Sequence, residues 1–299
     1  MRVVLTGVSG QVGRALVSPL GRLGQVVQAD RRLLDLAEPG KLTAALGRLA
    51  PDLIINPAAY TAVDRAEDER ELAFAVNAEA PGIIARWAAH RRVPLVHFST
   101  DYVFDGQGEP PWREDSPTGP LSVYGQSKLA GEEAIREAGG PHLIVRTSWV
   151  YAAQGTNFLR TMARLARERT EIRVVADQIG APTSARVIAD MMTRLLEANF
   201  SDLPQCFGRA EGIVNLAASG ETTWYGFACR IFEGLRARGA ALAVRSIVPL
   251  RTEEYPTKAK RPRNSRLDLT RLGQVFNIHT PLWDEALEPE LDQLTRASF

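Results

Sequence analysis

The chain alternates short apolar runs with longer amphipathic stretches through its first 150 residues. The runs are rich in Val, Ile and Leu, are apolar on both faces, and begin at residues 3, 26, 52, 94 and 142. Segments between them, such as 41–49 and 70–90, have helical periodicity. Strands that are apolar on both faces are typical of a parallel sheet covered by helices on both sides. The pattern therefore predicts an α/β fold with a doubly wound parallel sheet.

The alternation is less regular after about residue 150. Helical periodicity returns at 157–169, 185–197 and 224–238, a strand-like run lies at 172–177, and 201–212 has the composition of a loop. Prolines separate short segments in the final third. We therefore predict a sheet domain over residues 1–150, joined by elements from 172–200, and a smaller C-terminal cap formed mainly by residues 151–299.

The composition argues against several classes of protein. The 36 basic and 35 acidic side chains give a formal charge of +1, so no overall field draws the chain to nucleic acid or an anionic membrane. Neither Cys206 nor Cys229 belongs to a Cys-x-x-Cys pair, which argues against a disulfide framework or a zinc site. We predict no metal, and we interpret the four scattered histidines as surface or packing residues: His90, His97, His142 and His279.

The N-terminal segment enters a strand-like run at once, without the charged region and long apolar stretch of a secretory signal. No segment reaches the roughly 18 to 20 uninterrupted apolar residues of a membrane span. The low cysteine count also fits a reducing compartment. These features predict a cytoplasmic protein with no membrane partner.

A glycine-rich turn follows the first predicted strand. Gly7, Gly10 and Gly13 form a Gly-x-x-Gly-x-x-Gly run, and an apolar helix face begins at Leu16. Glycines there tighten the turn and let backbone N–H groups approach a pyrophosphate at the start of a helix. Asp30 closes the second strand, where a carboxylate accepts hydrogen bonds from an adenosine ribose. The arrangement predicts a Rossmann-type NAD(P)-binding domain; a tight turn without a ligand is the alternative interpretation.

Two arginines beside Asp30 bear on the choice between NADPH and NADH. The guanidinium of Arg31 or Arg32 is suited to pair with the 2′-phosphate of NADP, whereas the carboxylate of Asp30 repels that phosphate. We therefore expect both cofactors to be accepted. A solvated surface position is the alternative interpretation of each arginine.

Tyr124 and Lys128 form a Tyr-x-x-x-Lys motif. The four-residue spacing places both side chains on one helix face, with β-carbons roughly 5 to 6 Å apart. An ammonium beside a phenol favours the phenolate and lowers the pKa of a tyrosine, which is otherwise about 10. Thr100 ends the fourth predicted strand, where its hydroxyl points into the ligand crevice and can hydrogen-bond a carbonyl. Tyr124 is the expected proton donor, with Lys128 and Thr100 as its catalytic partners.

Seven motifs together resemble one family. In chain order they are TGVSGQVG, NPAAYTAVDRAE, FSTDYVFDG, YGQSKLAGE, RTSWVY, QIGAPTSA and RPRNSRL. They are similar to the extended short-chain dehydrogenases, and most closely to the dTDP-4-dehydrorhamnose reductase family, from the first residues to about Leu269. The resemblance implies an NADPH- or NADH-dependent oxidoreductase of dTDP-rhamnose biosynthesis. Such an enzyme reduces the 4-keto group of dTDP-4-dehydro-L-rhamnose and forms dTDP-L-rhamnose.

The resemblance also implies which residues contact the two ligands. At the sugar it places Thr100 and Asp101, with Trp149 packing its flat apolar face against the ring, although an indole at a strand end is more often part of the core. Arg261, in a late basic cluster, is expected to pair with the diphosphate; a solvated basic loop is the alternative. The implied cofactor contacts are Gly7, Gly10, Gln11, Val12, Gly13, Asp30, Asp35, Leu36, Ala59, Tyr60, Thr61, Tyr124 and Lys128.

Neighbouring activities can be compared with the residues present. Related nucleotide-sugar dehydratases carry a Thr-Asp-Glu run, whose acid-base pair removes a proton beside the ketone and expels water. Tyr102 takes the third position here, so carbonyl reduction fits better than dehydration. Two alternatives stay open: a nucleotide-sugar epimerase that uses the same Tyr and Lys, and a non-catalytic binding protein like the regulatory β subunit of methionine adenosyltransferase.

The resemblance bears on assembly as well. Some family members pair through magnesium held by carboxylates of two chains. Ala15 and Arg186 lie in the segments where such acids are expected, so no metal is carried over to this chain. A homodimer held by other contacts stays possible.

Overall fold

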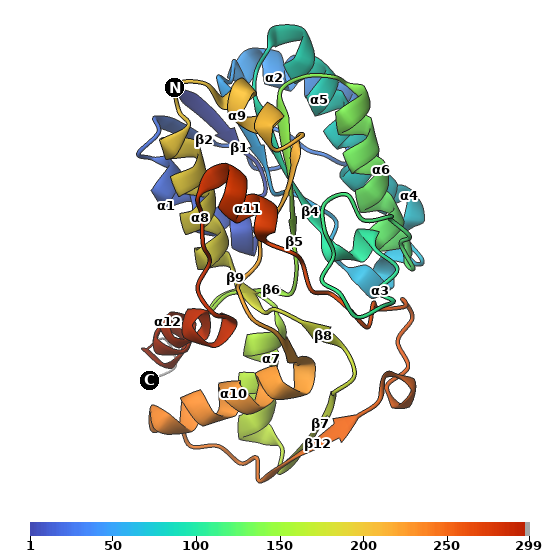
Figure 1. Cartoon of the computed structure of the whole chain (residues 1–299), viewed down its shortest axis with the longest axis vertical. Coiled ribbons are helices and arrows are strands. Elements are labelled where there is room, and N and C mark those ends of the chain that lie inside the picture. The colour runs from blue at the N-terminus through green and yellow to red at the C-terminus, as the bar shows by residue number, and fades with distance from the viewer. Residues whose placement is uncertain (297–299) are drawn as a thin grey trace.

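The structure is a computed structural model and describes residues 1–296. Its main sheet contains β1 (Arg2–Leu5), β2 (Gln25–Gln28), β3 (Leu53–Asn56), β4 (Leu95–Thr100), β5 (His142–Thr147) and β10 (Ile213–Asn215). All neighbouring strands are parallel, in the order β10-β5-β4-β3-β1-β2 (Figure 1). The chain moves outward in opposite directions from β1 and β3. A crevice for ligands is expected at the carboxyl ends of those two strands.

Helices cover both faces of this sheet. One face carries α1 (Gln11–Leu20), α8 (Ala185–Ala198), α9 (Leu203–Arg209) and α11 (Thr270–Phe276). The other carries α2 (Pro39–Leu49), α5 (Ala80–Arg91) and α6 (Val123–Glu137). Along β1, Val3 and Leu5 belong to the first core and Val4 to the second. The predicted doubly wound α/β fold is therefore confirmed, because strands covered on both faces are apolar throughout.

The helix expected over residues 70–90 is continuous but contains a π-helical turn that positions the site. Asn77, at its centre, is fully buried and donates to Oγ of Ser127 (2.9 Å) and to the carbonyl of Tyr60 (3.0 Å). Gly131 lets α6 approach, because a Cβ there would lie 2.1 Å from the carbonyl oxygen of Asn77. These contacts of the π-helical turn hold the loop after β3 against α6. The segments are α3 (Val63–Ala66), α4 (Arg70–Phe74), the π-helical turn η1 (Ala75–Glu79) and then α5.

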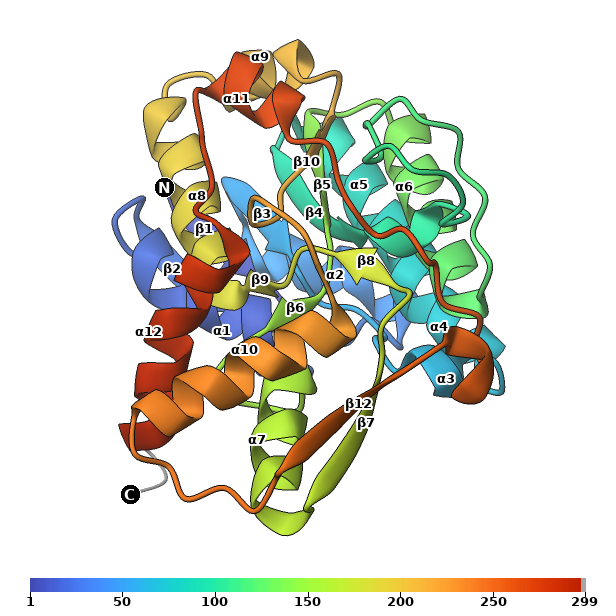
Figure 2. The same ribbon diagram turned by 60° about the horizontal axis from the view of Figure 1, so that its bottom comes forward.

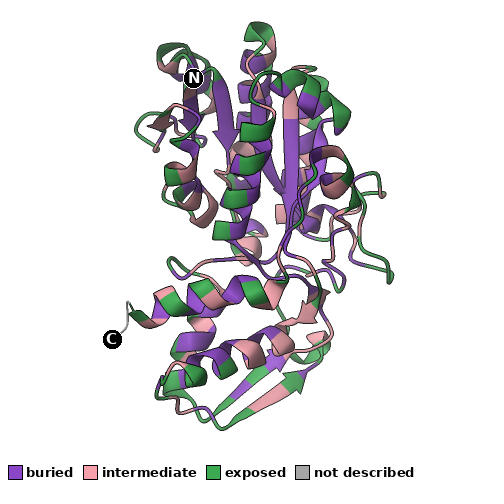
Figure 3. Cartoon of the chain, turned by 60° about the vertical axis from the view of Figure 1, so that its left-hand side comes forward, coloured by how far each residue is buried: buried purple, intermediate pink, exposed green. Residues whose placement is uncertain are grey.

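The chain after β5 builds a smaller lobe with a core of its own (Figure 2). Figure 3 shows buried residues concentrated in the main sheet and on the inward sides of the helices of both lobes. The lobe contains α7 (Phe158–Glu168), β7 (Glu171–Val175), α10 (Trp224–Ala237), β12 (Ser246–Leu250) and α12 (Trp283–Arg296). Short elements after β5 are β6 (Val150–Tyr151), β8 (Ile179–Gly180), β9 (Thr183–Ser184), β11 (Thr222–Thr223) and η3 (Thr252–Glu254). The short helix η2 (Asp101–Val103) directly follows β4 of the main sheet.

Segments after residue 150 contribute to both lobes. Of the 172–200 region that the sequence assigns to the larger domain, α8 packs in the large core, whereas β7 pairs with β12 in the small lobe. The strand β10 returns to pair with β5. The loop expected at 201–212 is wrong, because residues 203–209 form α9. Asp202 caps this helix by accepting from the N–H of Gln205 (3.0 Å), and Pro204 is tolerated in its first turn.

A buried ion pair ties α6 to β5. Nε of Arg146 donates to Oε1 of Glu132 (2.9 Å) and Nη2 donates to Oε2 (2.6 Å), and both side chains are excluded from solvent. The guanidinium also donates to the carbonyl of Glu114 (3.1 Å) and lies over the ring of Phe104. Glu132 also accepts from Nη2 of Arg136 (3.3 Å), whereas the buried guanidinium of Arg146 relies on Glu132 for its compensating charge.

Replacing Glu132 by Gln is expected to lower the free energy of unfolding by about 3 to 5 kcal/mol, since it leaves the guanidinium of Arg146 buried and uncompensated. Urea unfolding followed by circular dichroism measures the loss. Glu133→Gln, at the adjacent exposed position, is the control. Equal stability of the two variants would contradict the role of the pair.

Candidate active site

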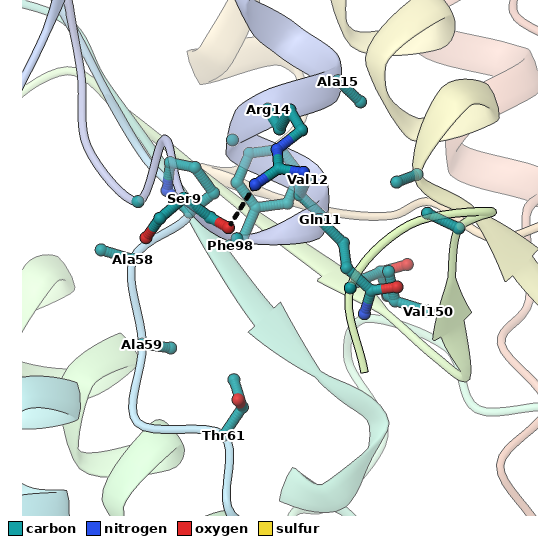
Figure 4. A pocket seen from close by; sticks show the side chains of 18 of the residues that line it. Ser9, Gln11, Val12, Arg14, Ala15, Ala58, Ala59, Thr61, Phe98 and Val150 are labelled. Carbon is teal, nitrogen blue, oxygen red and sulfur yellow. Dashed lines mark hydrogen bonds between the residues drawn. The ribbon is translucent and has the colours of Figure 1, made fainter. Parts of the chain in front are cut away.

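A cleft of about 1400 Å³ opens at the carboxyl ends of the main strands, between the two lobes. Figure 4 shows side chains of the glycine turn, including Gln11 and Val12, and of the loop after β3, including Ala59 and Thr61, on this cleft. Every residue predicted to contact the cofactor lines it, as do Thr100, Asp101 and Trp149. Arg261 is the exception among the predicted site residues.

The glycine turn has the shape that a dinucleotide requires. Gly7 has φ +60°, and a Cβ there would lie 2.8 Å from the backbone nitrogen of Ala58. A Cβ at Gly13 would lie 2.1 Å from the carbonyl oxygen of Gly7, so α1 packs directly on the turn. Gly10 is the N-cap of α1 and has no side chain to cover the first N–H groups. The helix start therefore fits a phosphate.

At the end of β2, Asp30 and the two arginines take different positions. The carboxylate of Asp30 accepts from Nε of Arg32 (3.0 Å) and from the N–H groups of Arg32 and Leu33. The hydrogen bond from Arg32 lowers the pKa of Asp30 below its usual value. Arg31 instead lines the cleft. The charge of Asp30 is thus partly balanced by Arg32, and Arg31 is the arginine of this pair that lines the cleft.

Tyr124 and Thr100 meet at the cleft. Thr100 ends β4, while Tyr124 lies in the first turn of α6, which Ser122 caps by accepting from the N–H of Gly125. Burial raises the pKa of the Tyr124 phenol to about 12, and hydrogen bonding with Thr100 offsets part of this rise. The ring of Tyr102 packs edge-on against that of Tyr124, 5.5 Å between centroids. The phenol is therefore held protonated beside the strand end.

Lys128 lies one turn further along α6 and is excluded from solvent. Its Nζ donates to the carbonyl of Phe98 (2.7 Å) and lies 3.1 Å from Nε2 of His97. Burial lowers the pKa of Lys128 to about 8. Lys128 is not among the groups that shift the pKa of Tyr124. The expected lowering of the Tyr124 pKa by the ammonium is therefore wrong for the protein without ligands, because burial raises that pKa and Lys128 does not offset the rise.

Residues that line the cleft at the ends of β4 and β5 contain buried polar atoms without hydrogen-bond partners. Oδ1 of Asp101 accepts from the hydroxyl of Thr100 (3.1 Å), whereas Oδ2 is buried with no hydrogen-bond partner among residues 1–296. The hydroxyl oxygens of Ser99, Thr147 and Ser148 are also buried, and none of them has a hydrogen-bond partner within this described range. Such atoms cost free energy unless a ligand satisfies them, so the site fits hydroxyl-rich groups. Sequence reasoning missed Thr147 and Ser148, although their position after β5 is the signal that identified Thr100.

An aromatic pair forms one wall of the cleft. Trp149 has φ +47° and stacks on Trp224 from α10, with ring centroids 3.6 Å apart and planes 10° from parallel. Gly180 makes room for the indole, because a Cβ there would lie 2.6 Å from Cε2 of Trp149. Both rings line the cleft. Trp224 was not identified from the sequence, because only the tertiary fold brings α10 to this wall.

Arg261 makes contacts outside the residues that line the cleft. Its Nη2 donates to Oδ2 of Asp64 (2.6 Å) in α3, and hydrogen bonding with Arg261 lowers the pKa of Asp64. Lys258, three residues before Arg261 in the segment that follows η3, forms an ion pair with Asp68. These pairs join the segment after η3 to α3 and the turn that follows it. The contact between Arg261 and a diphosphate stays a prediction.

Residues 1–296 contain no cluster of three or more His, Cys, Asp or Glu side chains placed to hold a metal ion. Arg186, in the segment considered for magnesium, donates from Nε to Oε1 of Glu290 (3.1 Å). Within the same described range, no helix is long and apolar enough to cross a membrane. The cytoplasmic location stays a prediction.

Comparison with known proteins shows which family the chain is similar to. The family model for the RmlD substrate binding domain matches residues 1–296. A protein of Burkholderia thailandensis named dTDP-4-dehydrorhamnose reductase is 47% identical over 292 residues, with 96% of this chain and 97% of that protein covered. The chain belongs to the dTDP-4-dehydrorhamnose reductase family. An Escherichia coli K12 reductase of this family is 42% identical, with 98% of each chain covered. The predicted family is therefore confirmed.

Solved structures of the family agree in fold. A dTDP-4-dehydrorhamnose reductase from Clostridium acetobutylicum has a TM-score of 0.88 and 34% identity, and the match covers 99% of this chain and 100% of that one. A dTDP-4-dehydrorhamnose reductase from Bacillus anthracis, in complex with NADP, has a TM-score of 0.86 and 35% identity. The match covers 98% of this chain and 99% of that one. The whole described chain, including the small lobe, thus has the architecture of the family.

Asp101 predicts a dependence of stability on pH. Burial raises the pKa of its carboxyl from 3.8 to about 6, so between these values the folded state holds a proton that the unfolded state releases. The free energy of unfolding therefore falls as the pH rises through this window. At about 1.4 kcal/mol for each pKa unit, the cost at neutral pH is roughly 3 kcal/mol.

Replacing Asp101 by Asn removes this cost. Relative to the wild type, the variant is expected to gain stability as the pH rises from 4 to 7, as measured by urea unfolding at each pH. Glu109→Gln, which removes an exposed carboxylate, is the control. If the free energy of unfolding changed equally with pH in the wild type and in Asp101→Asn, folding would not shift the pKa of the Asp101 carboxyl.

Proposed function

We propose that the chain reduces the 4-keto group of dTDP-4-dehydro-L-rhamnose to the alcohol of dTDP-L-rhamnose, with NADPH or NADH as reductant. The observation that carries this proposal is the meeting of Tyr124, Thr100 and the glycine turn on one cleft, with Lys128 buried behind them. Near-complete coverage of family members at 42 to 47% identity supports the same reaction.

The residues of the glycine turn and of the loops after β2 and β3 would hold the cofactor. Gly7, Gly10 and Gly13 would bring backbone N–H groups to its pyrophosphate, and Asp30 and Arg31, which line the same cleft, would lie at its adenosine ribose. The bound dihydronicotinamide would supply a hydride to the carbonyl carbon. Arg31 favours the 2′-phosphate of NADPH, while the partly balanced carboxylate of Asp30 also permits NADH. NADP is the ligand named for the Bacillus anthracis relative.

Tyr124 supplies the proton in this proposal. Its phenol donates to the ketone oxygen as negative charge develops there, and the hydroxyl of Thr100 supports the same oxygen. Lys128 places a cationic amine behind the phenol, which stabilises the phenolate left after transfer. Tyr102 occupies the position where an elimination reaction needs a carboxylic acid. Reduction without loss of water therefore fits these residues.

The nucleotide-sugar would lie between the lobes. The free oxygen of Asp101 and the hydroxyls of Thr147 and Ser148 are placed for sugar hydroxyls, and Trp149 offers an apolar face to the ring. We propose residues 1–150, with elements from 172–200, as the cofactor domain and 151–299 mainly as the substrate cap. Arg261 would reach the diphosphate by exchanging its bond to Asp64. A homodimer stays a prediction.

Replacing Tyr124 by Phe is expected to lower kcat by roughly 10² to 10⁴-fold, the range for loss of a general acid, while the Kd for NADPH changes little. Absorbance of NADPH with dTDP-4-dehydro-L-rhamnose measures turnover, and fluorescence titration measures cofactor binding. Net oxidation of NADPH by the wild type also separates a reductase from an epimerase, which regenerates its cofactor.

Tyr151→Phe is the matched control for this experiment. It removes a phenol oxygen that is buried outside the residues lining the cleft. Turnover in the control should stay near that of the wild type. If Tyr124→Phe also turned over normally, Tyr124 would not be the proton donor.

Arg31 yields a prediction about cofactor choice. Because its guanidinium would bind a charged phosphate, Arg31→Ala is expected to raise the KM for NADPH about 10- to 100-fold and that for NADH less than about twofold. Steady-state rates with each cofactor measure both values. Arg48→Ala, at an exposed position of α2, is the control, and equal changes with both cofactors would exclude a phosphate contact.

A further inference from the structure

Four polar side chains form a continuous hydrogen-bonded chain through the interior of the large lobe. The hydroxyl of Thr6 donates to Oδ1 of Asn56 (2.6 Å), and Nδ2 of Asn56 lies 3.0 Å from Nδ1 of His97. Nε2 of His97 lies 3.1 Å from Nζ of Lys128. All four residues are at most 1% exposed. The catalytic lysine is therefore the end of a polar chain that solvent does not enter.

The topology of the sheet explains this arrangement. Thr6 follows β1, Asn56 ends β3, His97 lies within β4, and Lys128 comes from α6. These strands are neighbours in the order β4-β3-β1, so the chain crosses the sheet where the strand order reverses. Thr6 also lines the cleft at the start of the glycine turn. One line of hydrogen bonds thus joins the cofactor side of the cleft to the amine behind Tyr124.

The donors and acceptors of this chain admit two arrangements. If Nδ2 of Asn56 donates to Nδ1 of His97, the proton of a neutral imidazole is on Nε2 and points at Lys128. The amine must then accept this hydrogen bond with its lone pair, so it is uncharged. If Lys128 is an ammonium, it donates to Nε2, and the ring proton is on Nδ1. The amide of Asn56 then turns so that Oδ1 accepts from Nδ1 and Nδ2 donates to the hydroxyl oxygen of Thr6.

We propose that His97 is a positioning residue for Lys128, and that the tautomer of its ring changes together with the charge of the lysine. The functional consequence rests on the proposed function, in which Lys128 acts behind the proton donor. His97 fixes Nζ from one side while the carbonyl of Phe98 fixes it from another. One N–H of the amine is then left for the phenol or the bound cofactor.

The charged surroundings support a neutral ring. Burial and the charge of Lys128 hold the pKa of His97 well below its ordinary value. On α6, the charge of Glu132 raises the pKa of Lys128 and so opposes the effect of burial. The carboxylate of Glu132 is itself paired with Arg146 of β5. Arg86 and His90 of α5 are exposed, and β3 contributes the neutral amide of Asn56. Lys128 is therefore the titrating group to which the ring of His97 responds.

A pair of variants at position 97 separates positioning from packing. Glutamine places an amide near the position of Nε2 and can still contact Lys128, whereas asparagine reaches only the position of Nδ1. His97→Asn is expected to lower kcat about 10- to 100-fold, the cost of losing a hydrogen bond to a charged group. The alkaline limb of its pH–kcat profile should move to lower pH, because the ammonium has lost an acceptor.

His97→Gln should recover most of the rate and the original pH profile. The thermal midpoint of each variant shows whether it is folded, and His90→Asn, at an exposed position of α5, is the control. A wild-type pH profile in folded His97→Asn would overturn the proposal. Equal profiles of the two position-97 variants would overturn it as well.

Nuclear magnetic resonance tests the same idea without relying on turnover. In protein labelled with ¹⁵N-histidine, the imidazole shifts report which nitrogen carries the proton. One neutral ring should change tautomer in the pH range where Lys128 titrates, near 8. Lys128→Met should abolish that change. A ring that becomes cationic near the ordinary histidine pKa, or one that keeps a single tautomer throughout, would overturn the proposal.

The two sets of results distinguish this inference from the proposed reaction. If the wild-type protein oxidises no NADPH with the keto-sugar, the proposed function fails, while the tautomer change still supports the coupling of His97 to Lys128. If turnover is normal but the ring shows no such change, the proposed function stands and the role of His97 is wrong.

Discussion

The parallel arrangement of six strands is the constraint on which the site depends. Because all strands point the same way, the residues that follow them are gathered at one edge of the sheet, although they lie far apart in sequence. Thr6, Thr100 and Thr147 reach the cleft for this single reason. The loops after β1 and β3 approach so closely there that Gly7 has no room for a side chain.

Burial of ionisable groups at this edge gives the site its electrostatic character. The acid Asp101 and the base Lys128 are both removed from water, and their pKa values move towards neutrality from opposite directions, to about 6 and about 8. A charge or dipole in such surroundings acts more strongly than it would in bulk solvent. Fixed polar groups therefore do not need to reorganise when charge develops on a carbonyl oxygen.

The fold, and the position of the glycine turn, Tyr124 and Lys128 on one cleft, could be predicted because their signals are local. The glycine turn and the Tyr124–Lys128 spacing occupy short stretches whose geometry follows from one turn or one helix. Trp224 and the hydrogen-bonded role of His97 depend on contacts between distant segments, so no spacing in the sequence reveals them. The helix α9 was missed because residues 201–212 were interpreted from their composition as a loop, although Asp202 supplies a helix cap.

The route of the chain after β5 has a consequence for how the lobes behave. Residues of the large core recur at 187–216 and 272–286, interleaved with small-core residues at 151–174, 227–244 and 287–294. The backbone therefore crosses the boundary many times. No single proteolytic cut would release either lobe as an intact folding unit, and a recombination event could not exchange the small lobe as one contiguous cassette. Several parallel connections also oppose twisting, which restricts relative movement more than a single flexible hinge would.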